Sequence, residues 1–279
     1  MLTKSKTQKA SVILKLFLVL FTNSLFFLAC VSQNITGTIE ESHKIIANSN
    51  SIQYYSYKNT YPTQKLQYHI VSIQLDDPLL RIISTLPNAD NTVTGQTTFD
   101  FAKKNGAVIA MNATPFSYPK FSLSSKRTIV GLYINEGKVV STGIQKYAAL
   151  CFGKDNKAFI VDSQIDPRIF DAWYAFGGFW TILENDIVYE FKDIKDARTV
   201  VGINSDGNKL YVLVVEKSNK SLGLNYMECA EILKNHGAVK AMQLDGGGSS
   251  SLILNKNKQD SVVSLRKVAI NLGFNVSHE

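Results

Sequence analysis

One carboxylate beside a run of glycines and serines is the first chemistry that the sequence offers. Asp245 ends a short apolar segment, and residues 246–251 continue as GGGSSS. Adjacent glycines raise the conformational entropy that is lost on folding, so a close approach to this backbone is the expected reason for them. Glycine N–H groups at a strand end bind anions or sugar oxygens. The alternative is a tight turn in which Asp245 bonds its own backbone.

This stretch does not indicate nucleotide binding or zinc. A phosphate-binding loop of the nucleotide type needs Lys and then Ser or Thr after its last glycine, whereas three serines follow Gly248. The dinucleotide fingerprint needs spaced glycines that open a helix. The chain has no HExxH or Cys/His ligand pattern. No cofactor is evident, and a divalent metal stays open because oxygen-ligand sites leave no reliable spacing.

The segments around Asp245 predict the elements that position it. The stretch after Asn225 is expected to be a helix, with Asn225 as N-cap, Glu228 completing a capping box and Gly237 as the stop. A second short helix is expected to stop at Gly106 and to feed a buried strand at 108–112.

Hairpins are the commonest pattern in the rest of the chain. They are expected at 131–141, 181–191 and 202–216, each around turn residues of the Asn, Asp, Glu and Gly types. Cys151 and Cys229 lie in apolar contexts and are expected to be buried thiols rather than a disulfide. The prediction is an α+β fold, a single domain built on mixed, hairpin-rich β-sheet with a few flanking helices.

The N-terminal 29 residues are interpreted as a signal peptide. Four lysines precede or begin an apolar stretch that polar residues 22–24 interrupt, which is typical of secretion rather than of a membrane span. The stretch ends in FLAC, which resembles a bacterial lipobox, so Cys30 is the expected lipidation site; ordinary secretion without lipidation is the alternative. Residues 30–51 are then a polar tether and residues 52–279 the domain.

The charge of the chain argues against nucleic acid as a partner. The formal net charge is +7, and four of the positive charges belong to the signal peptide. The remaining lysines are scattered and give no basic patch of the nucleic-acid-binding kind. The expected location is the cell surface or the periplasmic face of a bacterial membrane.

Several motifs, taken in order, resemble the phosphodiester glycosidase domain family, the relatives of the mannose 6-phosphate uncovering enzyme. They are MNATPF (111–116), FGGFWTILENDIV (176–188), RTVVGINSDGNKLYVLVV (198–215), SLGLNYMECAEIL (221–233), GAVKAMQLDGGGSSSLIL (237–254) and LRKVAI (265–270). The resemblance covers residues 66–276, and its second half is the more specific part. It implies a hydrolase that releases a sugar, N-acetylglucosamine in the animal member, from a phosphodiester.

The chain departs from the family pattern at two places. The family usually has Asn-Gly-Gly-Phe-Phe where this chain has the sequence NATPF at 112–116. The family's Asp-Gly-Arg after the third hairpin is Glu216-Lys217-Ser218 here, which keeps a carboxylate and loses the arginine. Both changes concern the identity of the substrate more than the chemistry.

Hydrolysis of a sugar-1-phosphodiester requires a carboxylate near the anomeric carbon, donors for the phosphate and polar groups for the sugar. The candidate catalytic residues are Asp245 and Glu216, and Arg198 is the candidate bidentate phosphate ligand. The further substrate-binding candidates are Thr199, Asn112, Gly246, Gly247, Gly248, Ser249 and Gly178. The structural alternatives are a surface ion pair for Arg198, a solvated strand end for Glu216, backbone bonding for Asn112 and close backbone packing for Gly178.

The sequence therefore predicts a secreted or surface-anchored hydrolase of a sugar-1-phosphodiester in envelope or extracellular glycan. Its expected partners are a carbohydrate or sugar phosphate and, through Cys30, a membrane. Trp173, Tyr174 and Trp180 are expected in an aromatic core, with a carbohydrate site as the alternative. Two other functions remain open, which are a non-catalytic glycan-binding lipoprotein with the same fold and a structural envelope protein.

Lipidation of Cys30 is testable by metabolic labelling. Acyl chains contribute about 0.8 kcal/mol per buried methylene, so the lipidated protein should partition into the detergent phase. Labelling with palmitate should vanish in Cys30→Ser. Unchanged labelling in this variant, or a wild-type protein that stays in the aqueous phase, contradicts the assignment.

Overall fold

The computed structural model describes residues 37–46, 51–90, 92–118 and 125–277. The predicted signal peptide and Cys30 lie outside these residues. Within them, no helix combines the length and the apolar character that crossing a membrane requires.

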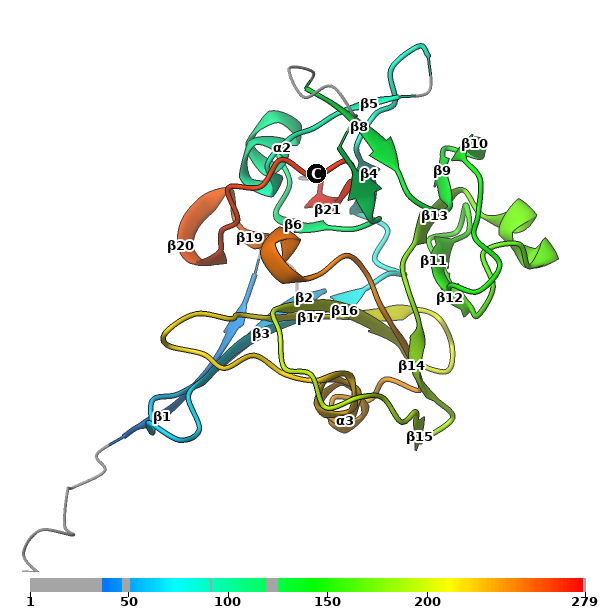
Figure 1. Ribbon diagram of the computed structural model, residues 1–279. Helices are drawn as coiled ribbons and strands as arrows, with labels where there is room; N and C mark the ends of the chain where they lie inside the picture. The colour runs from blue at the N-terminus through cyan, green and yellow to red at the C-terminus, as the bar shows by residue number, and fades with distance from the viewer. Residues whose placement is uncertain (1–36, 47–50, 91, 119–124, 278–279) are drawn as a thin grey trace, which may run out of the picture.

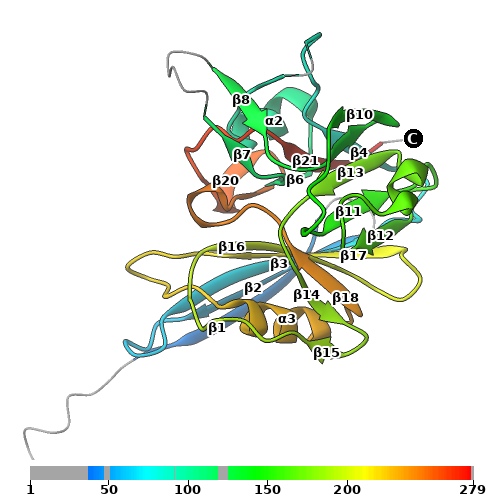
Figure 2. The same cartoon turned by 45° about the vertical axis from the view of Figure 1, so that its right-hand side comes forward.

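The largest layer is an eight-stranded sheet (Figures 1 and 2), with the strand order β1-β2-β3-β17-β16-β18-β14-β15. Its strands are Ile39–Ile45 (β1), Ile52–Asn59 (β2), Leu66–Gln74 (β3), Lys209–Val215 (β17), Arg198–Ile203 (β16), Lys240–Gln243 (β18), Thr181–Glu184 (β14) and Ile187–Val188 (β15). Every pair in it is antiparallel.

Three smaller sheets lie over one face of this layer. One has the order β20-β19-β6-β21-β4, another β10-β9-β13-β11-β12 and the smallest β5-β8-β7. The strands of the first are Asn257–Val262 (β20), Leu252–Leu254 (β19), Ile109–Asn112 (β6), Asn271–Val276 (β21) and Leu80–Ser84 (β4). Those of the other two are Lys138–Ser141 (β10), Tyr133–Asn135 (β9), Tyr174–Gly177 (β13), Ala149–Phe152 (β11), Ala158–Val161 (β12), Val93–Thr94 (β5), Lys126–Ile129 (β8) and Phe116–Ser117 (β7).

The described strand pairs of the smaller sheets are antiparallel as well. The α+β single domain is therefore confirmed, but the expectation of mixed sheet is wrong in that detail. Hairpin connections produce antiparallel neighbours directly, whereas parallel neighbours need long crossover segments.

The predicted hairpins form, and their turn residues explain why. Glu136 and Gly137 both have positive φ in the turn between β9 and β10, as do Asn185 and Asp186 between β14 and β15. Positive φ at both central residues is the geometry of the two-residue turn that matches strand twist. Gly207 has φ +67° in the loop that joins β16 to β17.

Two α-helices are present in the described residues, and both end where local signals predict. The helix α2 (Thr98–Asn105) stops at Gly106, which has φ +69°. The helix α3 (Tyr226–Asn235) begins with the complete capping box of Asn225 and Glu228 and ends at Asn235, with His236 as C-cap directly before Gly237. In Figures 1 and 2, α3 lies on the face of the large sheet that is opposite the smaller sheets.

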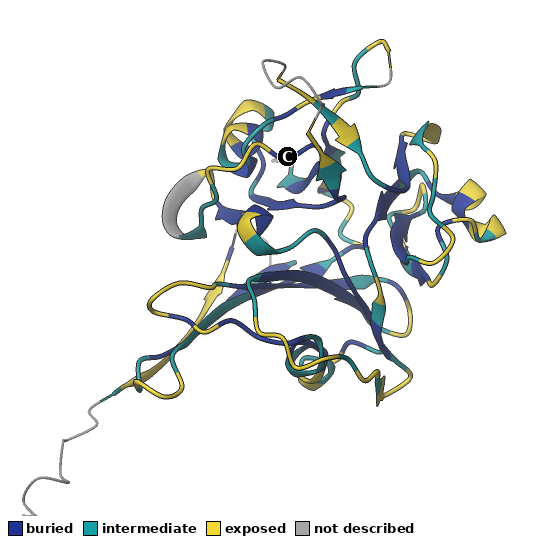
Figure 3. Ribbon diagram, viewed as in Figure 1, coloured by how far each residue is buried: buried dark blue, intermediate teal, exposed yellow. Residues whose placement is uncertain are grey.

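The large sheet is buried on both faces over much of its area (Figure 3). We call the side that packs on α3 the helix face, with Val200, Leu213 and Val215 in its apolar cluster. We call the other side the inner face, where Val201 and Val214 pack with residues of the smaller sheets. Because side chains alternate along a strand, consecutive residues of β16 belong to different faces.

The expected tether contains a strand. Residues of β1 pair with β2 from Ile39↔Asn59 to Ile45↔Gln53, so regular structure begins before the predicted domain boundary at residue 52. All seven residues of β1 are exposed, so the strand shows no alternation of buried and exposed side chains from which it could be predicted. Cys151 and Cys229 are buried free cysteines, which confirms the prediction for both.

Candidate functional site

The loop that carries Asp245 closes over the inner face at one end of the large sheet. It follows β18 and continues into the short 3₁₀ helix η2 (Gly247–Ser249). The N–H of Asp245 donates to the carbonyl of Ala113 at 2.9 Å, and the N–H of Gly247 donates to the carbonyl of Ala197 at 2.9 Å. The loop is therefore held by the segment after β6 on one side and by the start of β16 on the other.

The side chain of Asn112 is the central anchor of this loop. Its Nδ2 donates to the backbone carbonyl of Asp245 at 2.7 Å. Its Oδ1 accepts from the Thr199 hydroxyl at 2.8 Å and from the N–H of Ser251 at 3.0 Å. Asn112 and Thr199 are both fully buried. Neither can touch a substrate in this arrangement, so the predicted substrate contacts are corrected to positioning roles.

The Asp245 carboxylate is partly buried and hydrogen-bonded. It accepts from the N–H of Gly246 at 3.1 Å. Burial raises the pKa of this carboxyl group above its ordinary value, while hydrogen bonds from Ser249 and Gly246 and the charge of Arg266 act in the opposite direction. A raised pKa from burial, beside a cation, is typical of a carboxylate placed for function.

Arg266 is a cation of the site that sequence reasoning missed. Its Nη1 donates to Ser249 Oγ at 3.3 Å, and the Ser249 side chain and the charge of Arg266 both lower the pKa of Asp245. A β-carbon on Gly248 would lie 2.5 Å from Arg266 Nη2, so glycine at 248 lets the guanidinium approach the loop. Arg266 is exposed and forms no ion pair with any residue that the structure describes. The sequence feature that could have indicated Arg266 is the LRKVAI motif at 265–270, which contains it.

Arg198 does not share this site. Its Nε donates to the Leu224 carbonyl at 3.2 Å and its Nη2 to the Ile194 carbonyl at 2.6 Å. The guanidinium lies 4.1 Å from the ring centroid of Tyr226 on the helix face, and Arg198 is only 7% exposed. The prediction that Arg198 holds a phosphate is therefore corrected, because its donors are directed to backbone carbonyls on the opposite face.

The three glycines do not form an open set of N–H donors. The N–H of Gly246 bonds Asp245, and that of Gly247 bonds Ala197. Only the N–H of Gly248 has no hydrogen bond within the described part of the chain. Gly247 has φ +58°, a left-handed conformation that favours glycine. Conformation at Gly247 and close packing at Gly246 and Gly248 thus account for the three glycines, and the N–H of Gly248 remains available to a ligand.

Glu216 lies at the same end of the sheet with a partner that the sequence did not reveal. Its Oε1 is 2.9 Å from His69 Nε2, and His69 Nδ1 is 2.7 Å from the Tyr54 hydroxyl. A carboxylate accepts, so Nε2 carries the proton of the first bond. Glu216 and Asp245 follow β17 and β18, with β16 between them, so strand spacing separates their backbones by about 10 Å. Asp196 lies between them and pairs with Lys217 at 3.4 Å.

Gly178 is a packing residue rather than a substrate ligand. A β-carbon there would lie 2.2 Å from the carbonyl oxygen of Gln243, so only glycine allows this approach to β18. Trp180, its neighbour by two residues, is 40% exposed and contacts the rings of Phe179 and Tyr226. The expectation of an aromatic core at Trp173, Tyr174 and Trp180 is not met, because none of the three is buried and Trp173 lies against Gly137 and Lys154 instead.

Buried polar atoms without a partner are concentrated around the Asp245 loop. Among the described residues they belong to Thr114, Gln243, Ser250 and Asn271. Thr114 follows Asn112 by two residues, Asn271 is the cross-strand partner of Asn112, and the other two flank Asp245 in sequence. Unpaired buried groups are costly, and native structures keep few of them.

In the described ranges, no group of three or more His, Cys, Asp or Glu side chains converges on a metal position.

The fold and this carboxylate–serine–arginine arrangement define an antiparallel β-domain with a polar site at one sheet end. A sequence model of the phosphodiester glycosidase family matches residues 105–275. The chain belongs to the phosphodiester glycosidase family. The match includes Asp245, Glu216 and Arg266.

Named relatives agree with this assignment. The chain is 38% identical over 66 residues to N-acetylglucosamine-1-phosphodiester alpha-N-acetylglucosaminidase of Mus musculus, which is 24% of this chain and 13% of the mouse protein. It is 23% identical over 215 residues to the SPbeta prophage-derived protein YomE of Bacillus subtilis, or 71% of this chain and 32% of that protein. The chain therefore spans less than half the length of these relatives.

Solved structures share the fold. A hypothetical protein from Synechocystis gives a TM-score of 0.67 at 13% identity, over 85% of this chain and 64% of that one. The catalytic domain of the zebrafish N-acetylglucosamine-1-phosphodiester alpha-N-acetylglucosaminidase, auto-inhibited by its pro-peptide, gives 0.59 at 20% identity, over 89% and 85%.

Removing the Asn112 side chain should loosen the Asp245 loop. Asn112→Ala leaves the Thr199 hydroxyl, the Ser251 N–H and the Asp245 carbonyl unpaired, so the free energy of unfolding should fall by at least about 3 kcal/mol. Thr199→Ser, which keeps the hydroxyl, should cost at most about 1 kcal/mol. Urea denaturation and hydrogen exchange at 246–251 measure both effects. Unchanged exchange in Asn112→Ala would show that the loop is anchored elsewhere.

The raised pKa of Asp245 predicts a pH-dependent stability difference. Its contribution to folding is present below the ordinary value of 3.8 and is lost as pH rises through the raised folded value. Asp245→Asn carries no charge, so it should be more stable than wild type at pH 7, and the difference should shrink toward pH 4. Denaturant unfolding at several pH values measures it. A difference that grows on acidification contradicts the raised pKa.

Proposed function

We propose that the protein hydrolyses a sugar-1-phosphodiester, with Asp245 as the catalytic carboxylate and Arg266 as the phosphate-binding cation. The observation that carries the proposal is that Arg266 donates to the Ser249 hydroxyl at 3.3 Å, and that both side chains act on Asp245 and lower its pKa. This arrangement fixes a carboxylate beside an unpaired guanidinium. A phosphodiester presents the complementary pair, an anomeric carbon next to an anionic group.

Arg266 suits a phosphate because of its exposure and geometry. The guanidinium offers a planar fork of N–H donors, and one of them is engaged by Ser249. The N–H of Gly248 has no hydrogen bond in the described residues and adds a backbone donor. Together they stabilise the negative charge of the leaving phosphate. A phosphate is already a good leaving group, so one carboxylate with anion recognition can suffice.

Glu216 serves as the second carboxylate in this proposal. The bond from His69 Nε2 orients it, and Tyr54 fixes the imidazole through Nδ1. With their backbones about 10 Å apart, the two carboxylates act from different sides of a bound sugar, and Asp196 lies between them. The relatives' names point to N-acetylglucosamine as the first sugar to test.

Location is a second part of the proposal. The lysine-led apolar segment and FLAC sequence support export and lipidation at Cys30. The substrate class then becomes a sugar phosphodiester of the envelope or of extracellular glycan, within reach of a surface-anchored domain. A non-catalytic glycan-binding lipoprotein is the outcome if binding occurs without turnover.

The experiment is turnover of N-acetylglucosamine-1-phosphate methyl diester by variants of matched thermal stability. Asp245→Asn should lower kcat by at least ~100-fold, because the charge is lost while the size is kept. Arg266→Lys should lower kcat/KM by more than about tenfold, because the point charge remains but the fork is lost. Arg81→Lys, on an exposed arginine outside the site, is the matched control.

The outcomes separate the parts of the proposal. Equal turnover by wild type and Asp245→Asn would make Asp245 a turn residue and remove the catalytic assignment. Equal rates for wild type and Arg266→Lys would assign the phosphate to another group. If the wild type hydrolyses neither this diester nor the corresponding glucose and galactose diesters, the hydrolase proposal fails.

A further inference from the structure

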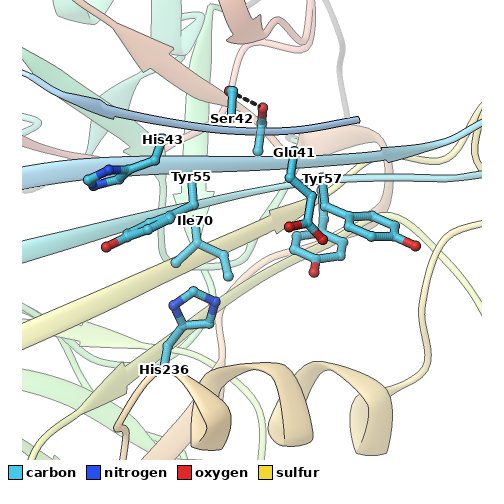
Figure 4. A pocket seen from close by; sticks show the side chains of 9 residues that line it. Glu41, Ser42, His43, Tyr55, Tyr57, Ile70 and His236 are labelled. Carbon is cyan, nitrogen blue, oxygen red and sulfur yellow. Dashed lines mark hydrogen bonds between the residues drawn. The ribbon is translucent and has the colours of Figure 1, made fainter. Parts of the chain in front are cut away.

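A groove on the helix face of the large sheet lies apart from the Asp245 site. It has a volume of about 370 Å³ and is bounded by β1, β2 and β3 and by the end of α3. Figure 4 shows Tyr55 on the side of the groove near His236, at the end of the helix, and Tyr57 at the other side. The volume is at the lower end of the range for small-molecule pockets, roughly 300–1,000 Å³.

The groove exists because α3 covers only part of its sheet face. The helix packs against β14, β15, β16, β17 and β18. Tyr55, Tyr68 and Ile70 of β2 and β3 belong to the same face, but their outer neighbours are the exposed residues of β1. Aromatic surface is therefore left open between a helix end and an edge strand.

Aromatic rings give the groove its shape. Tyr57 and Tyr68 stack with their centroids 4.9 Å apart and an interplanar angle of 10°. His43 and Tyr55 stack at 4.4 Å, and Tyr55 meets His236 edge-on at 5.3 Å. One stack joins β1 to β2 and the other joins β2 to β3, so both ring pairs line the same groove. Flat aromatic faces of this kind pack against the C–H faces of sugar rings.

Polar groups at the rim are available to a ligand. The side chains of Glu41, Tyr68 and His236 make no hydrogen bond to any other side chain or backbone group in the described ranges. Burial, Tyr57 and Glu41 raise the pKa of Tyr68 to about 12, so its hydroxyl stays a donor at neutral pH. Burial and Lys209 lower the pKa of His236, which favours its neutral form. The rim thus offers donors and acceptors and no fixed cation.

We propose that this groove binds a neutral pyranose ring of a glycan chain, separately from the Asp245 site. The outer face of the Tyr57–Tyr68 stack contacts the pyranose ring, and Glu41, Tyr68 and His236 bond its hydroxyl groups. The Glu41 carboxylate disfavours an anionic ligand, so the phosphate-bearing part of a polymer is excluded here. The groove would hold a surface glycan while the sheet end presents Asp245.

The test is affinity electrophoresis of the full domain in gels that contain soluble neutral polysaccharides, namely an α-glucan, a β-glucan and a galactomannan. At least one polymer should retard the wild type, and Tyr57→Ala and Tyr68→Ala should each weaken the apparent affinity by about tenfold, on the scale of an aromatic contact. The matched control is Tyr189→Ala, which removes a partly exposed tyrosine beside β15 at the opposite edge of the same sheet.

A second variant separates this proposal from the hydrolase proposal. Asp245→Asn should keep the retardation, because the loop lies at the other face of the sheet. Retardation that is equal in wild type and Tyr68→Ala, or that is lost only in Asp245→Asn, overturns the groove as the binding site. Absence of retardation by all three polymers overturns it as well. Circular dichroism of Tyr57→Ala and Tyr68→Ala excludes misfolding as the cause of lost binding.

Discussion

The candidate site depends on one buried amide. Asn112 joins three segments that are far apart in sequence, bonding Thr199, Asp245 and Ser251 over separations of 87, 133 and 139 residues. A loop with three adjacent glycines has more conformations to lose than any other loop of its length. Because both ends of that loop bond the same side chain, Asn112 selects one of these conformations. The amide can do so because it is fully buried, so water does not compete for its hydrogen bonds.

The same arrangement sets the electrostatics of Asp245. The loop lowers the carboxylate toward the sheet and removes part of its water, which raises its pKa. Interactions with Ser249 and Arg266 offset part of the solvation energy that the carboxylate loses on burial. The apolar layers on both faces of the large sheet supply the stability against which this cost is balanced. Stability and function therefore pull in opposite directions at this residue.

Local signals in the sequence predict local structure well. The capping box of α3 and the positive-φ turns involve residues two or three positions apart, so their geometry follows from residue type. No comparable signal in the sequence indicates which side chains that are far apart along the chain face the same site. Arg198 and Thr199 are adjacent in β16, and alternation places them on opposite faces, so they cannot both serve one site. His69 lies 147 residues from Glu216, and no spacing rule connects them. The exposed strand β1 has no apolar alternation to distinguish it from a tether.

One of the two places where this chain departs from its family lies against the same loop. The family's paired glycines are Ala113 and Thr114 here, and the carbonyl of Ala113 holds the N–H of Asp245 at 2.9 Å. Thr114 adds a buried hydroxyl that has no partner among the described residues, next to Asn112. An unpaired buried hydroxyl costs about 1–3 kcal/mol. The Ala113 side chain packs in the hydrophobic core and Thr114 is buried, so these side chains lie beneath the Asp245 loop and add a polar atom one residue from the contact that fixes it. The departure from the family therefore changes the packing under the loop, while the Asn112 anchor and the carboxylate itself are retained.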